Sequence, residues 1–128
     1  MAALIQFKGS EEGVTLRLEN QVSRIGRGTD NDIIIHDELV SKHHATIEAR
    51  PIAEQPGQFA YFLEDCASTN GSFVNDRRVD ACPLQHDDVL RFGINHFRFV
   101  DDANDDLAAT TRIHKTWIPG LYVSRRKK

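Results

Sequence analysis

The chain has 128 residues, of which 40% are hydrophobic and 27% are charged, and its formal net charge is −3. This length suits one ordinary domain with a short extension, and the apolar share can fill one core. So small a net charge creates no field that attracts nucleic acid or an anionic membrane, so any anion must be bound locally. The chain has no cationic leader and no run of about 18 apolar residues, the length a membrane span needs. We therefore expect a soluble, cytoplasmic protein with Cys66 and Cys82 reduced.

Short stretches of alternating apolar and polar residues recur up to residue 100, and turn residues separate them. A period of two is typical of half-buried strands. The predicted strands are Leu4–Lys8, Val14–Leu18, Val22–Ile25, Ile33–Ile35, His44–Arg50, Phe59–Leu63, Phe73–Val74, Arg78–Val79, Val89–Phe92 and Phe97–Val100. Their spacing indicates an all-β sandwich or barrel, and no helix of ordinary length fits among them.

The composition changes at Asp101, where an acidic stretch begins that is typical of a domain end. We expect one domain over residues 1–100, followed by an acidic linker and a C-terminal tail over residues 101–128. Within the tail, Leu107–Thr116 has the pattern of a short helix. The apolar residues of Trp117–Val123 need cover, either from the sandwich or from a partner, which includes self-association through the tail.

Gly26-Arg27-Gly28 follows a predicted strand and leads into a loop too polar for a core. Glycine on both sides allows a ligand to approach closely, and the guanidinium of Arg27 offers a fork of donors that matches phosphate or carboxylate. Taken alone, this pattern fits a surface arginine beside a turn better than it fits a binding site.

Ser41 and Lys42 stand directly before another alternating strand. A hydroxyl can donate to an oxyanion, and the neighbouring ammonium adds a mobile positive charge with three donors. The pair indicates an anion site at the rim of a sheet.

The segment Ser68-Thr69-Asn70-Gly71 closes a further strand. Asn-Gly is a strong turn signal because both residues tolerate positive φ. A plain hairpin turn is one interpretation. The excess of hydrogen-bonding groups favours another, a row of donors for a bound peptide or phosphate.

Together, Gly26-Arg27, Ser41-Lys42-His43-His44 and Ser68-Thr69-Asn70-Gly71, followed by Val74-Asn75, resemble the forkhead-associated (FHA) domain family. The resemblance extends from about Leu4 to Val100. The chain departs from the family at Asp76 and Asp87, where glycine is usual. Aspartate tolerates the left-handed region better than most residues, so we expect a local cost and an intact fold.

The resemblance implies an eleven-stranded β-sandwich with its ligand loops at one end, and a phosphothreonine in an extended peptide as the ligand. By the family pattern, Arg27 and Ser41 bind the phosphate, with Lys42 near it. Thr69 lines the pocket, and Asn70 hydrogen-bonds the peptide backbone. The implied partner is a phosphothreonine-containing protein, for example a substrate of a Ser/Thr kinase.

Three further residues have structural roles in the family pattern: Gly26, His44 and Gly71. His44 supports the Ser41 loop, and Gly71 permits the turn. Elementary electrostatics supports the same ligand. Phosphothreonine carries about −1.5 to −2 charges, so one guanidinium and one ammonium nearly neutralise it. Binding of this kind requires neither a catalytic residue nor a cofactor.

An enzyme is an alternative, because Ser41 beside His43 or His44 suggests a nucleophile with a base, and six histidines suggest zinc. Neighbouring strand residues point to opposite faces, so the two histidines cannot share a metal. A nucleophilic serine also needs a third group that orients the base, and none stands out. We therefore expect no catalytic site and no metal site.

A second alternative is a phosphate-independent adaptor that holds its partner on a sandwich face or on the tail. Large aromatic residues anchor interfaces, and Trp117 and Tyr122 are candidates. The tail also suggests regulation, since Thr110 and Thr111 follow the acidic stretch and are candidate phosphorylation sites. A phosphorylated tail could be captured by an FHA pocket, with a second copy reached more easily than the pocket of the same molecule.

Overall fold

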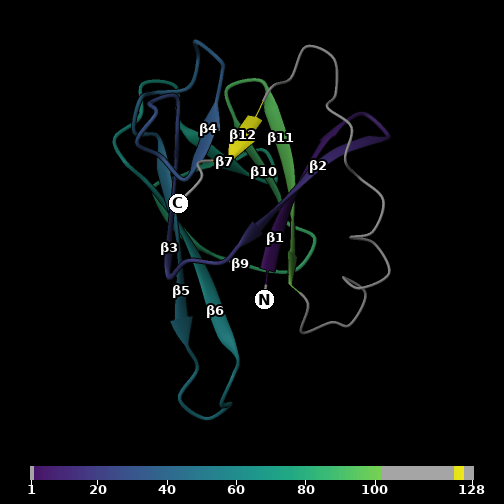
Figure 1. Cartoon of the computed structure of the whole chain (residues 1–128), viewed down its shortest axis with the longest axis vertical. Coiled ribbons are helices and arrows are strands. Elements are labelled where there is room, and N and C mark those ends of the chain that lie inside the picture. The colour runs from purple at the N-terminus through teal and green to yellow at the C-terminus, as the bar shows by residue number, and fades with distance from the viewer. Residues whose placement is uncertain (1, 102–122, 126–128) are drawn as a thin grey trace.

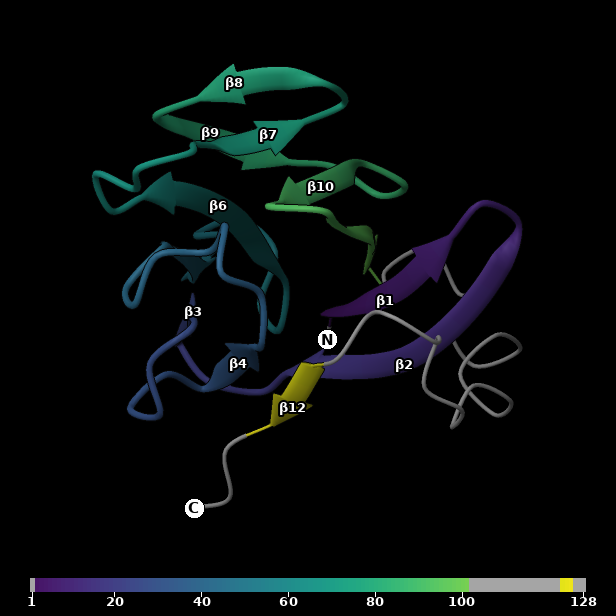
Figure 2. The same cartoon turned by 90° about the horizontal axis from the view of Figure 1, so that it is seen from above.

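The computed structural model describes residues 2–101 and 123–125, and these residues form two packed β-sheets of six strands each. Figure 2 shows the two sheets facing each other across the core. The first sheet consists, in spatial order, of β2 (Glu11–Leu18), β1 (Ala2–Lys8), β11 (Asn95–Asp101), β10 (Val89–Phe92), β7 (Ser72–Val74) and β8 (Arg77–Val79). The second consists of β12 (Val123–Arg125), β4 (Ile33–Ile35), β3 (Val22–Gly26), β5 (Ala45–Pro51), β6 (Phe59–Asp65) and β9 (Ala81–Leu84).

All strand pairs are antiparallel except β3 with β4, which are parallel. The prediction of an all-β sandwich is confirmed. Residues 2–101 supply eleven strands, the number that the resemblance implied, and β12 adds a twelfth beside β4.

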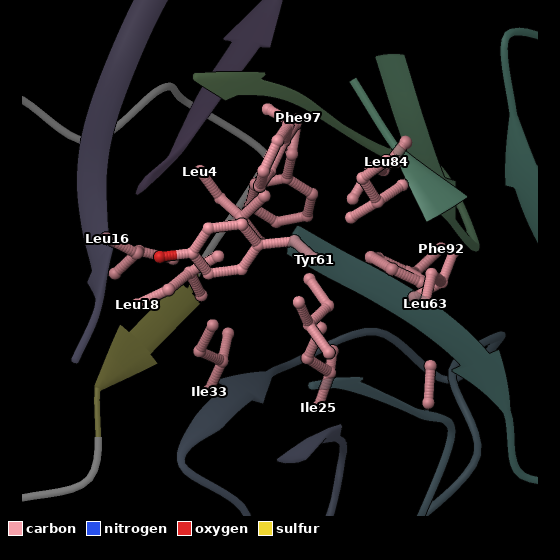
Figure 3. Packing of buried hydrophobic residues seen from close by; sticks show 14 of the residues in the cluster. Leu4, Leu16, Leu18, Ile25, Ile33, Tyr61, Leu63, Leu84, Phe92 and Phe97 are labelled. Carbon is pink, nitrogen blue, oxygen red and sulfur yellow. The ribbon is translucent and has the colours of Figure 1, made fainter. Parts of the chain in front are cut away.

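The core lies between the sheets because the alternation of most strands turns one set of side chains inward. In β5, for example, Ala45, Ile47 and Ala49 are buried. Figure 3 shows Tyr61 and Leu63 of β6 packed with apolar side chains of the opposite sheet, among them Leu4 and Phe97. Burial of this apolar area is the main stabilising contribution to the sandwich, and the sandwich holds the loops at its ends.

Strand register gathers three loops at one end of the second sheet. Ile25, one residue before the end of β3, pairs with Ile33 of β4 and with Ala45, the first residue of β5. Ala45 in turn pairs with Asp65, the last residue of β6. The loops after β3, before β5 and after β6 therefore leave the sheet at the same level. Figure 1 shows the blue loops after β3 and β4 at the end of the molecule opposite the β5–β6 hairpin.

Two strands were not predicted from the sequence. Strand β9 contains Pro83 and forms an edge of the second sheet, where a residue without a backbone N–H is tolerated. Strand β12 pairs Val123 with Ile35 of β4. The helix expected over Leu107–Thr116 and the candidate phosphorylation sites Thr110 and Thr111 lie outside the described residues, as do Trp117 and Tyr122.

The two aspartates that stand where the family has glycine adopt the left-handed conformation. The φ angle is 66° at Asp76 and 76° at Asp87. This confirms the expectation that the fold tolerates both substitutions. Within residues 2–101 and 123–125, no helix has the length and apolarity that a membrane span would require.

Candidate functional site

The first two of the gathered loops are the β3–β4 loop (residues 27–32) and the β4–β5 loop (residues 36–44), and backbone hydrogen bonds join them. The amide of Arg27 donates to the carbonyl oxygen of Ser41 at 2.9 Å, and the amide of Gly28 donates to that of Lys42 at 3.1 Å. Two such bonds fix the backbone of Arg27 beside that of Ser41. Arg27 and Ser41 are fourteen residues apart in the sequence. Their side chains, the guanidinium and the hydroxyl, nevertheless extend from neighbouring backbone positions.

Arg27 is exposed, yet one of its side-chain nitrogens is held by the protein. Its Nε donates to the carbonyl oxygen of Val40 at 3.0 Å. The two terminal nitrogens have no protein partner among the described residues. They are donors that a planar or tetrahedral oxyanion can use.

Ser41 links the second loop to the third, the β6–β7 loop (residues 66–71). Its Oγ accepts a hydrogen bond from the backbone amide of Thr69 at 3.1 Å. Because the oxygen is the acceptor in this contact, the hydroxyl hydrogen remains available as a donor. Thr69 itself is exposed at the loop surface.

Asn70 and Lys42 complete the exposed set. The Nδ2 of Asn70 donates to the carbonyl oxygen of Leu39 at 2.9 Å, which orients the amide and leaves Oδ1 as an acceptor. The ammonium of Lys42 is exposed and makes no ion pair with any residue that the structure describes.

His44 is fully buried below these loops and connects the second to the third. Its Nδ1 accepts from the amide of Ser41 at 3.0 Å, and its Nε2 lies 2.8 Å from the carbonyl oxygen of Gly71. An amide can only donate and a carbonyl can only accept, so the imidazole is neutral with its proton on Nε2. The ring packs edge-on against Phe92, with 5.6 Å between the ring centroids.

Gly26 is buried where the first two loops meet. A Cβ at this position would overlap the carbonyl oxygen of Lys42 and lie 2.8 Å from the Nδ2 of Asn31. The side chain of Asn31, also buried, donates to the carbonyl oxygens of Gly28 at 2.8 Å and Lys42 at 2.6 Å. The sequence analysis missed Asn31 because it treated this segment only as a polar loop, and no local pattern marks the contact.

Asp65 closes the third loop at its base. Its Oδ1 accepts from the hydroxyls of Ser68 and Ser72, each at 2.6 Å, and its Oδ2 accepts from the amide of Ser68 at 2.9 Å. Partial burial alone would raise the pKa of the Asp65 carboxyl, but these hydrogen bonds outweigh that effect and hold the pKa below its ordinary value. Ser68, interpreted from the sequence as a ligand donor, is buried and directed into this network.

The structure therefore places all eight predicted residues at one end of the sandwich, in two groups. The exposed or half-buried group consists of Arg27, Ser41, Lys42, Thr69 and Asn70. The buried group below it consists of Gly26, His44 and Gly71.

His43 points away from His44, and its Nε2 lies 2.7 Å from the Oδ2 of exposed Asp30. Ser41 thus has no imidazole in hydrogen-bond contact with its Oγ among the described residues, so the geometry does not support a serine nucleophile. What these loops assemble is a set of cations and hydrogen-bond donors.

Comparison with known proteins yields one family. The FHA domain model matches residues 23–93. Among curated proteins, a segment of an ABC transporter ATP-binding/permease protein of Mycobacterium tuberculosis is 42% identical over 78 residues, which is 61% of this chain and 8% of the transporter. The glycogen accumulation regulator GarA of Mycolicibacterium smegmatis is 31% identical over 99 residues, which is 77% of this chain and 57% of GarA. The chain therefore matches only part of the length of either relative.

Solved structures agree with this result. A domain from a structural analysis of phosphothreonine-dependent FHA interactions has 32% identity and a TM-score of 0.65, over 78% of this chain and 95% of that domain. The FhaA FHA domain, solved in complex with the intracellular domain of Rv3910, has 32% identity and a TM-score of 0.64, over 77% of this chain and 99% of that one. Because the family model matches more than half of the chain and the strand arrangement is shared, this chain belongs to the FHA domain family.

Proposed function

We propose that this protein binds phosphothreonine-containing segments of partner proteins and so mediates phosphorylation-dependent association in Ser/Thr kinase signalling. The observation that carries the proposal is the joining of the three loops through Ser41, whose carbonyl oxygen binds the Arg27 amide and whose Oγ binds the Thr69 amide. The phosphothreonine-dependent interactions of a related FHA domain of 32% identity support it.

Each exposed side chain has a role that its contacts allow. The free terminal nitrogens of Arg27 and the hydroxyl of Ser41 donate to phosphate oxygens, and Lys42 supplies the second positive charge. Two cations nearly balance the roughly −1.5 to −2 charges of the phosphate. Thr69 lines the pocket, and Asn70, already oriented by Leu39, hydrogen-bonds the backbone of the bound peptide.

The expected discrimination against unmodified threonine follows from the same contacts. A hydrogen bond to a charged group contributes about 1.5–3 kcal/mol, and an unphosphorylated peptide loses several of them at once. We therefore expect dissociation constants on the order of micromolar for phosphothreonine peptides and binding too weak to measure for unmodified ones.

Calorimetry with a library of phosphothreonine peptides and their unphosphorylated counterparts tests the proposal. The matched variants are Arg27→Ala and Arg24→Ala, because Arg24 is an exposed arginine within β3, three residues before Arg27 and outside the loops. Arg27→Ala should reduce affinity at least thirtyfold, and Arg24→Ala by less than twofold. Equal binding of phosphorylated and unphosphorylated peptides would refute the proposal. A cellular partner that is retained after Arg27→Ala would favour the phosphate-independent adaptor instead.

We also propose that residues 1–100 form the binding module and that residues 101–128 form an acidic linker and a C-terminal tail, of which β12 pairs with β4. The hydrogen-bonded loops described above all lie within residues 26–72. Peptide binding should accordingly depend on substitutions in these loops and not on substitutions at Thr110 or Thr111.

A further inference from the structure

We propose that Arg78 forms a second anion subsite beside the phosphothreonine pocket, where it binds an acidic or phosphorylated side chain of the same peptide. This inference rests on the proposed function, because the second group is delivered by a peptide that is anchored at Arg27 and Ser41.

The position of Arg78 is set by the β7–β8 hairpin. Arg78 of β8 pairs with Phe73 of β7, and Phe73 in turn pairs with Arg91 of β10. Paired residues share a face of a sheet, and the next residue along β7, Val74, is buried in the core. Arg78, Phe73 and Arg91 therefore lie on the outer face of the first sheet, and Figure 2 shows β8 at the edge of that sheet next to β7.

From this edge the side chain of Arg78 reaches back to the third loop. A Cβ placed on Gly71 would lie 2.7 Å from the Nε of Arg78 and 3.1 Å from its Cζ. The guanidinium therefore packs directly on the outer side of Gly71. Gly71 follows Asn70, and its carbonyl oxygen faces His44, so this cation stands at the rim of the proposed peptide site.

The charge of Arg78 is available to a ligand. Arg78 is exposed and makes no ion pair or hydrogen bond with any other residue in the described part of the chain. Arg91, by contrast, is engaged: its Cζ lies 3.9 Å from the centroid of the Phe73 ring, and its Nη1 is 3.4 Å from the carbonyl oxygen of Gly93. Of these two arginines on the outer face, only Arg78 lacks a hydrogen-bond, ion-pair or ring partner among the described residues, so its guanidinium is free to bind an incoming anion.

Geometry limits where that anion stands in the peptide. Gly71 is two residues beyond Thr69, so their Cα atoms are at most about 7.6 Å apart. An extended peptide advances about 3.3 Å per residue. The second anionic side chain should therefore lie two to four residues from the phosphothreonine.

Anisotropy titrations with short phosphothreonine peptides test this subsite. One arm places a single glutamate, and the other a single phosphoserine, at each position within four residues of the phosphothreonine in an alanine background. The proteins are the wild type, Arg78→Gln and Arg77→Gln. Arg77 is a matched control because it is exposed and adjacent, but it pairs with Val74 and so projects from the other face of β8.

The wild type should prefer glutamate over alanine by about two- to fivefold at one or two positions, as expected for an exposed ion pair. A phosphoserine at the same positions should raise the affinity about tenfold over alanine, because the guanidinium can bind the phosphate with two parallel hydrogen bonds. Arg78→Gln should remove both preferences and change the affinity for the alanine peptide by less than twofold. Arg77→Gln should keep both preferences. Raising the salt concentration from 0.1 to 0.5 M should reduce both preferences of the wild type.

The possible results separate the two proposals. If wild-type protein binds the phosphothreonine peptides but shows no preference for a second anion, or if Arg78→Gln keeps that preference, the subsite is wrong and the proposed function stands. If wild-type protein does not distinguish the phosphothreonine peptides from unmodified ones, the proposed function itself fails. A preference for phosphoserine without one for glutamate would identify a doubly phosphorylated partner as the ligand.

Discussion

Replacing His44 by alanine tests whether the buried imidazole holds the binding loops together. The substitution removes the hydrogen bonds to the Ser41 amide and the Gly71 carbonyl oxygen, at 3.0 and 2.8 Å. Each is worth about 1 kcal/mol, and more when its partner is left buried without a replacement. The edge-on contact with Phe92 adds about 0.5–1.5 kcal/mol. We therefore expect His44→Ala to lower the free energy of unfolding by about 3–4 kcal/mol, a large part of the 5–15 kcal/mol of a typical domain.

Urea denaturation measures this change, and His43→Ala is the matched control. His43 is the neighbouring residue but is exposed, and its contact with Asp30 should contribute no more than about 1 kcal/mol. The affinity for a phosphothreonine peptide should fall at least tenfold in His44→Ala and less than twofold in His43→Ala. Equal losses of stability in the two variants would refute the assignment of a bridging role to His44.

Three other substitutions test separate parts of the same end of the sandwich. The lowered pKa of Asp65 means that its stabilising contribution is present above the ordinary carboxyl pKa of 3.8 and is lost as the pH falls through the lower folded value, so Asp65→Asn should be destabilising in urea at pH 7 and much less so near pH 2. Gly26→Ala should cost at least about 2 kcal/mol in the same assay, because its Cβ would overlap the Lys42 carbonyl oxygen. Asp76→Gly should raise the melting temperature by relieving left-handed strain at φ 66°, and an unchanged or lower value would contradict this reasoning.

The sequence predicted the strands whose alternation is clear and missed those whose existence depends on a neighbour. Strand β5 alternates strictly, so its buried residues could be identified without the structure. Strand β9 has a proline at its third position and is a strand because it pairs with β6. Strand β12 lies in the tail, beyond the acidic stretch at which the sequence analysis ended the domain, and is a strand because it pairs with β4. Such strands are set by tertiary context, which local propensity does not contain.

The same limit separates the predicted from the missed residues of the site. The residues that a ligand would touch follow the FHA pattern and could be assigned by resemblance to it. The residues that hold the loops have no such local signal. Asp37 illustrates this, because its Oδ2 accepts hydrogen bonds from the amide of Ile94 and from the Nδ2 of Asn95, 57 and 58 positions along the chain, each at 3.0 Å. Only the folded chain brings these groups together.

Gly71 forms the turn and contacts both the imidazole of His44 and the guanidinium of Arg78. Replacing it by alanine tests whether the second-anion preference depends on the position of Arg78 and not only on backbone strain. The φ angle of Gly71 is +92°, and an added Cβ would lie 2.7 Å from the Nε of Arg78. Gly9→Ala is the control, since Gly9 has a φ of +62° but open space around the added Cβ. Both variants should lose about 1–2 kcal/mol of unfolding free energy from the left-handed conformation. Only Gly71→Ala should also move the guanidinium, so it alone should abolish the preference for a second anion. If Gly71→Ala keeps the preference for a second anion, the contact of the Arg78 guanidinium with Gly71 is not needed for ligand binding.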